Sequence, residues 1–217
     1  TICVSNTRAK KFHTVTSKSN KPDGISSGWV QSLYQENDSI MWLGLNGNGL
    51  NRFNLNTGTA QKFSNNPKDE RSLGHNSVIA IDQDNQKRIW VGLAGGGLNR
   101  LDPTTNKFTR FESGNENSIS NNAVSAMLVD KDNLIWITTF RSGLSIYNIN
   151  QNKFINLKDD SLQENSGISF TNIDNIFELN GNIWFKGIEQ LVVFDKTYKQ
   201  FVKIAYTDGA VSPTTTA

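Results

Sequence analysis

The sequence predicts an all-β fold, a β-propeller built of four-stranded antiparallel blades. The first observation behind this prediction is a tryptophan that recurs at intervals of 48, 46 and 48 residues, as Trp42, Trp90, Trp136 and Trp184. The second is that each tryptophan lies in a short apolar run that a glycine turn separates from another apolar run, the pattern of a hairpin. Repeats of this length are typical of propeller blades, whereas leucine-rich repeats are shorter. Helical repeats need an apolar period of about 3.6 residues, which the chain lacks.

Four apolar runs recur in the same order within each repeat. In the second repeat the tryptophan strand begins at Ile89, Gly97 lies in the turn, and Leu98 and Leu101 return apolar surface to the core. Glycine suits this turn because it adopts positive φ without steric cost. The fourth strands are predicted at 60–63, 107–111, 153–157 and 200–204.

The order of these strands predicts the organisation of the domain. We expect an N-terminal tail plus the outer strand of an incomplete blade in residues 1–24, because Lys10–Val15 match a fourth strand. Four blades follow in residues 25–206, at about 25–66, 67–114, 115–160 and 161–206, and a linker or tail in 207–217. Fourth strands therefore outnumber the other three kinds, which favours a segment of a larger propeller over a closed four-bladed ring with one displaced outer strand.

Charge and composition limit the classes of partner that the chain is expected to bind. The net charge is +2, with 22 basic and 20 acidic residues well mixed along the chain, which gives no support for nucleic-acid binding. No apolar run approaches the roughly 18 residues of a spanning helix, so we expect no membrane contact by this segment itself. The single cysteine, Cys3, excludes an internal disulfide. Unclosed terminal blades expose strand edges and blade faces, which predicts self-association through them.

The repeats resemble the two-component regulator propeller repeat. Residues 76–103 match its pattern closely, residues 122–148 and 28–54 match it well, and the last blade keeps only Asn182–Trp184 and a weak turn at Val193–Asp195. The resemblance implies a periplasmic or other extracytoplasmic sensor region of a membrane-anchored receptor, most often a hybrid histidine kinase and sometimes a diguanylate cyclase. It also implies a small-molecule ligand, often an oligosaccharide released from a polysaccharide.

Two motifs that suggest bound ions are better interpreted as turns. The stretches 82–85 and 130–133 resemble calcium loops, but they lack the later glycine and glutamate of an EF-hand and lie where a hairpin must turn. The glycines of 94–97 join two strands and precede no helix, so a phosphate loop is not expected. We predict no metal and no cofactor.

Candidate binding residues are those that depart from the repeat. The loop that enters each blade shares a rim with the turn between its second and third strands, and the departures there are Trp29, His75, Arg141 and Glu189, with Asn46, Asn48 and Phe140 in the same loops. An exposed aromatic ring stacks on a sugar or anchors a partner, and an arginine binds a carboxylate. The alternatives are that Trp29 packs under a neighbouring loop or against a missing blade, and that His75 and Arg141 are solvated loop residues.

These observations favour a non-catalytic, ligand-sensing segment. No Ser-His-Asp or Cys-His grouping follows from the spacing of the two histidines, so no catalytic residues are predicted. A protein-interaction or self-assembling scaffold is the alternative. A propeller lyase or hydrolase is disfavoured because no His/Glu/Tyr cluster falls on one rim.

Overall fold

The computed structural model describes residues 2–6, 11–15, 23–157, 167–188, 190–207 and 210–214, and these form nineteen β-strands. Four antiparallel sheets follow one another along the chain and correspond to the predicted blades, which confirms the fold class. Blade 1 contains β3 (Val30–Asn37), β4 (Ile40–Leu45), β5 (Leu50–Asn54) and β6 (Thr59–Phe63). Blade 2 contains β7 (Val78–Gln83), β8 (Ile89–Leu93), β9 (Leu98–Asp102) and β10 (Lys107–Phe111). Blade 3 contains β11 (Val124–Val129), β12 (Leu134–Thr139), β13 (Gly143–Asn148) and β14 (Lys153–Leu157). Blade 4 contains β15 (Ile173–Leu179), β16 (Asn182–Gly187), β17 (Leu191–Asp195) and β18 (Gln200–Thr207).

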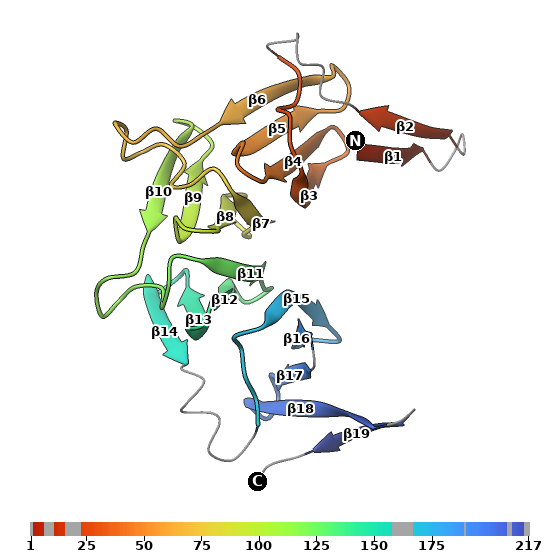
Figure 1. Cartoon of the computed structure of the whole chain (residues 1–217), viewed down its shortest axis with the longest axis vertical. Helices are drawn as coiled ribbons and strands as arrows, with labels where there is room; N and C mark the ends of the chain where they lie inside the picture. The colour runs from red at the N-terminus through yellow and green to blue at the C-terminus, as the bar shows by residue number, and fades with distance from the viewer. Residues whose placement is uncertain are drawn as a thin grey trace.

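The blades lie along an open arc (Figure 1). The first strands β3, β7, β11 and β15 face the inside of the arc and the fourth strands lie outside. Each first strand contacts the first strand of the next blade, whereas among the described elements β3 and β15 are not joined in this way. Within the described part of the chain, no helix has the length and apolar character needed to cross a membrane.

Each end of the chain contains a strand that the sequence pattern does not predict. Residues 1–24 are expected to be a tail plus one outer strand, but β1 (Ile2–Asn6) pairs with β2 (Lys11–Val15) as a hairpin. Its register, Asn6 opposite Lys11, matches Asp102 opposite Lys107 in blade 2. Residues 207–217 are expected to be a linker, but β19 (Ala210–Thr214) pairs with β18. The free edge of an outermost strand offers unpaired N–H and C=O groups, to which a further strand can pair.

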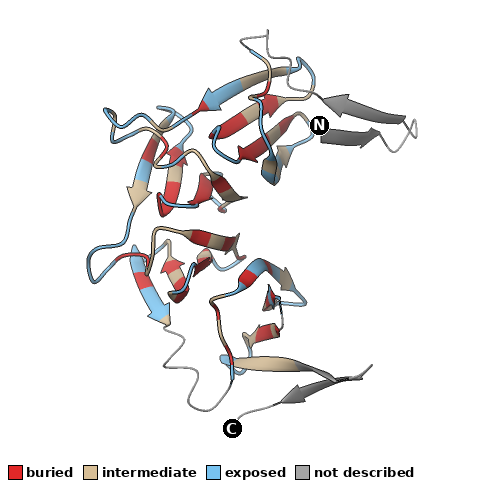
Figure 2. Ribbon diagram, viewed as in Figure 1, coloured by how far each residue is buried: buried red, intermediate tan, exposed pale blue. Residues whose placement is uncertain are grey.

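Neighbouring blades pack through the alternation of side chains along the second strand. In β8, Trp90 belongs to the hydrophobic cluster shared with blade 3, whereas Ile89 and Val91 belong to the cluster shared with blade 1. A Cβ atom at Gly92 would lie 2.8 Å from Cγ1 of Val124 on the next inner strand, so only glycine leaves room for that valine. Figure 2 shows that buried residues concentrate on the second and third strands, with exposed residues on the outer ones.

Each tryptophan indole in blades 1 to 3 is held by an acidic side chain six residues earlier. Trp90 Nε1 donates to Asp84 Oδ2 at 2.8 Å, and Trp136 Nε1 donates to Asp130 Oδ2 at 2.9 Å. Glu36 plays the same part for the tryptophan of blade 1, at 2.8 Å. The acidic residues predicted to lie in turns are therefore also internal partners of the blade, which explains why they recur with the repeat.

The same carboxylates organise the turn between the first two strands. Asp84 Oδ1 accepts hydrogen bonds from the backbone N–H groups of Gln86 and Arg88 at 2.9 and 3.0 Å. Arg88 Nε lies 2.6 Å from Asp84 Oδ2.

Within the described residues, no group of three or more His, Cys, Asp or Glu side chains is placed to hold a metal ion. The carboxylates of 82–85 are accounted for by the turn and by the next blade, since Asp82 Oδ2 accepts from Val129 N at 2.8 Å. Burial raises the pKa of Asp82, although backbone hydrogen bonds from Val129 and Gln83 oppose the shift.

Blade 4 departs from this arrangement. Glu178 occupies the acidic position, but its Oε1 lies 3.8 Å from Nζ of both Lys131 and Lys196. Trp184 Nε1 is buried without a hydrogen-bond partner. Burial lowers the pKa of Lys196, but hydrogen bonds to Asp132 and Asp130 outweigh this and raise it. The fourth copy thus keeps the acidic residue and the tryptophan of the repeat, but not the hydrogen bond between them.

Candidate functional site

The loop that enters each blade and the turn between its second and third strands form one rim, here called the loop rim. A buried aliphatic residue anchors each entering loop, and these residues are Ile25, Leu73, Ile119 and Ile168. The next backbone N–H is bound by a side chain of the third strand or the turn before it. Gly74 N donates to Asn99 Oδ1 at 2.8 Å, and Ser26 N donates to Asn51 Oδ1 at 2.7 Å. The asparagine of each Leu-Asn-Arg sequence therefore fixes the loop from within.

Trp29, the first sequence candidate, lies on the loop rim with 80% of its surface exposed. Its backbone oxygen accepts a hydrogen bond from Asn46 N at 2.9 Å, which ties the entering loop to the turn of the same blade. The indole ring is thus presented to solvent rather than packed under a neighbouring loop. A large exposed ring held on a fixed backbone is suited to stacking on a planar or apolar ligand face.

Asn46, Asn48 and His75 are linked to the loop of Trp29 by a chain of contacts at the junction of blades 1 and 2. Asn46 Oδ1 accepts from Ser77 Oγ at 3.1 Å, and Ser77 N donates to Nδ1 of His75 at 3.1 Å. The Asn48 side chain lies against Gly28, where a Cβ atom would be 3.0 Å from Nδ2. These residues and Trp29 form one polar and aromatic patch, which we call the Trp29 patch.

Phe140 and Arg141 form a second patch on blade 3. Phe140 is 54% exposed, and the Arg141 guanidinium carbon lies 5.0 Å from the centre of its ring, a cation–π contact. The turn is fixed by Phe140 N donating to Ala123 O at 2.8 Å. The structure records no contact between these two residues and the Trp29 patch among the described residues. The sequence candidates therefore share a rim but do not converge on one pocket.

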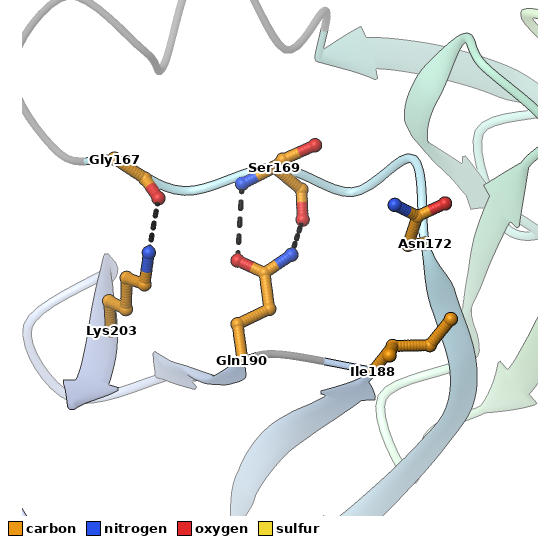
Figure 3. A pocket seen from close by; sticks show the side chains of 6 residues that line it. All are labelled: Gly167, Ser169, Asn172, Ile188, Gln190 and Lys203. Carbon is orange, nitrogen blue, oxygen red and sulfur yellow. Dashed lines mark hydrogen bonds between the residues drawn. The ribbon is translucent and has the colours of Figure 1, made fainter. Parts of the chain in front are cut away.

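A hollow of about 350 Å³ lies on the loop rim of blade 4 (Figure 3). Ser169 N donates to Gln190 Oε1 at 3.3 Å, and Gln190 Nε2 donates to Ser169 O. Lys203 Nζ donates to Gly167 O at 2.7 Å. Gln190 thus does in blade 4 what Asn99 does in blade 2, so its first role is to hold the entering loop. Glu189, the sequence candidate in this turn, lies outside the described residues.

Ile188 and Gln190 line this hollow but are not among the residues predicted from the sequence. Ile188 is 77% exposed on the rim, and Asn172 lies across from it (Figure 3). The sequence does contain a signal for Gln190. Blade 4 has Val192 at the position where blades 1 and 2 have the loop-binding asparagine, and it has a glutamine two residues before that position. That displacement identifies the turn as a departure from the repeat.

The exposed groups of the loop rim are suited to binding a ligand. Its exposed groups are aromatic and aliphatic side chains, one guanidinium and several amides, and no side-chain hydrogen bond joins His75 to a nucleophile in the described residues. Such groups stack on, and donate to, a neutral or acidic polar ligand.

Comparison with known proteins agrees with this architecture. The family model for the two component regulator propeller matches residues 118–141. No curated protein sequence matches the chain. Among solved structures, the chain resembles the extracellular domain of BT3049 from B. thetaiotaomicron, a protein assigned to the hybrid two component systems. Identity is 22%, the TM-score is 0.73, and the match covers 88% of this chain and 26% of that one.

Two further structures share the fold. The extracellular domain of BT4673 from B. thetaiotaomicron, likewise assigned to a hybrid two component system, has 16% identity and a TM-score of 0.65, over 88% of this chain and 31% of that one. The WD40 repeats of RRP9 have 11% identity and a TM-score of 0.61, over 81% and 51%. The chain thus spans about a quarter to a third of the two extracellular domains. The resemblance seen in the sequence is confirmed: the chain carries a two-component regulator propeller repeat within a β-propeller fold.

Proposed function

We propose that the chain is a ligand-sensing segment of the extracytoplasmic sensor region of a two-component-type receptor and is not itself catalytic. The observation that carries this proposal is the similarity of the blades to the extracellular domain of BT3049 over 88% of the chain. The parent receptor is then anchored in the inner membrane and carries a histidine kinase or diguanylate cyclase output domain. The loop rim supports the proposal of ligand sensing. Its exposed residues differ between blades, whereas its buried residues recur with the repeat.

We assign ligand contact to the Trp29 patch, with the Phe140–Arg141 pair and the hollow of blade 4 as flanking contacts. The ligand is a small molecule or an oligosaccharide whose apolar ring face stacks on the indole. An aromatic stacking contact contributes about 1 kcal/mol, and about 1.4 kcal/mol corresponds to a tenfold change in affinity. Loss of the Trp29 ring is therefore expected to be measurable.

The test is calorimetric titration of the chain with a panel of neutral and acidic oligosaccharides, followed by variants. We expect Trp29→Ala to weaken binding of the best oligosaccharide about fivefold. The matched control is Tyr198→Ala, which removes an exposed ring (72%) from the turn between β17 and β18, away from the loop rim. Equal weakening by both variants, or absence of saturable binding across the panel, would contradict the proposal.

A self-assembling scaffold is the second candidate, and the outer faces of blades 1 and 4 favour it. Phe177 and Leu179 are 36% and 48% exposed on blade 4, on the face where Trp184 has no hydrogen-bond partner. Leu33 is 52% exposed on the face of blade 1 directed away from blade 2. In the three seams between described blades, the equivalent faces are covered by a neighbour.

Light scattering on the purified chain tests this candidate. We expect a dimer or larger species, returned toward the monomer mass of 24.2 kDa by Phe177→Glu. Ile155→Glu is the control, because Ile155 is 51% exposed on the outer strand of an internal blade. A wild-type chain that is monomeric at all concentrations tested would exclude self-assembly.

A further inference from the structure

The residue that follows the third strand fills the seam with the preceding blade in two of the three described seams. In blade 3 this residue is Ile149, which packs against the hydrophobic cluster that contains Trp90. In blade 4 it is Lys196, whose Nζ lies 2.9 Å from Asp130 Oδ2. In blade 2 it is Pro103, and there a hollow of about 190 Å³ remains between blades 1 and 2. The hollow is thus the place of a side chain that blade 2 lacks.

The floor of this hollow is apolar. Trp42, Ile89 and Leu101 line it and are 3%, 3% and 1% exposed, and Pro103 forms a wall. The volume corresponds to about six water molecules in the liquid, given roughly 30 Å³ for each. The equivalent position of the next seam is filled by the branched aliphatic side chain of Ile149, so the repeat itself indicates an aliphatic occupant of similar size.

The mouth of the hollow is positively charged. Glu36 Oε2 already accepts from Trp42 Nε1 at 2.8 Å and lies 3.5 Å from Arg52 Nε. Lys87 also lines the mouth, and no ion pair is recorded for it within the described residues. Two cations and one engaged carboxylate leave an excess positive charge, which favours an anionic head group.

The seam between blades 3 and 4 shows the opposite case. There the occupant is the cation Lys196, and it lies within 4 Å of three carboxylates, those of Asp130, Asp132 and Glu178. The charge of the occupant in this seam is therefore opposite to the charge of the side chains around it. By the same rule, the occupant of the seam between blades 1 and 2 carries a negative charge.

We propose that the hollow between blades 1 and 2 binds a short branched aliphatic carboxylate. The aliphatic part lies on Trp42, Ile89 and Leu101 as Ile149 does in the next seam, and the carboxylate lies near Lys87 and Arg52. The hollow lies where the strands meet the turns that contain Lys87 and Pro103, at the opposite end of the blades from the loop rim, so it is separate from that rim and does not rest on the proposed function.

Calorimetric titration of the chain with 4-methylpentanoate tests the proposal. We expect saturable, millimolar binding at one site, with no binding of the matched amine, 4-methylpentylamine. A second titration with N-acetyl-leucine distinguishes a free acid from the carboxyl terminus of a peptide. Binding of 4-methylpentanoate alone identifies a free acid, and binding of both identifies the shared branched carboxylate.

Three variants locate the site. Pro103→Ile places an Ile149-like side chain in the hollow, and we expect at least a tenfold loss of affinity. Lys87→Glu reverses the charge at the mouth on an exposed turn, and we expect a similar loss even if the first variant folds poorly. Lys153→Glu makes the same charge change on the exposed edge of blade 3 and should bind as wild type. Absence of saturable binding, preference for the amine, or wild-type affinity in Lys87→Glu would overturn the proposal.

Discussion

Replacement of Trp90 by alanine is expected to lower the free energy of unfolding by about 3–5 kcal/mol, the cost typical of removing a large aromatic residue from a core. Trp90 is fully buried between blades 2 and 3, where its ring centre lies 5.5 Å from that of Phe111 and 5.6 Å from that of Tyr147. The loss removes these contacts and leaves a cavity in the seam. Urea unfolding followed by circular dichroism measures the change.

The matched control is Trp184→Ala, at the same position of blade 4. Trp184 is only partly buried, stacks on Phe177 with ring centres 6.2 Å apart, and has no indole hydrogen bond. We expect it to lose less than half as much stability as Trp90→Ala. Equal losses would show that the repeat position, rather than the seam around it, determines the contribution of the tryptophan.

Replacement of Asp84 by alanine is the second large effect that we expect, a loss of about 3 kcal/mol. The Asp84 side chain is fully buried and accepts from the indole of Trp90 and from two backbone N–H groups of its turn. Removal leaves these donors and the guanidinium of Arg88 without their acceptor, and breaking one partner of a buried charged pair costs about 3–5 kcal/mol. The same unfolding experiment measures the loss, and Asp84→Asn should recover part of it because an amide oxygen still accepts one bond.

Glu178→Ala is the comparison for Asp84. Glu178 occupies the same position in blade 4, but its recorded ion pairs are two contacts of 3.8 Å with lysines. Long, partly exposed ion pairs contribute about 0–1 kcal/mol, so we expect a small change. A loss equal to that of Asp84→Ala would mean that Glu178 binds the indole of Trp184 in solution.

The sequence by itself determined the blades, because the signals that define them are local. Alternation along each strand, the recurring tryptophan and the glycine turn predicted the fourth strands to within a few residues, as for 107–111 and 153–157. The departures on the loop rim could also be found, since a change such as Trp29 is visible against three other copies. Gln190 was missed because its role is displaced along the chain from that of Asn99.

The tertiary structure decided what depends on neighbouring blades. Whether Asp84 holds an indole while Glu178 does not, and whether Pro103 leaves a hollow that Ile149 fills in the next seam, follows from packing between residues about one repeat apart. A period in the sequence fixes which side chains face a seam, because successive strand residues point to opposite faces. It does not fix how well two unlike faces fill the space between them, and that fit determines where a ligand or a second copy finds room.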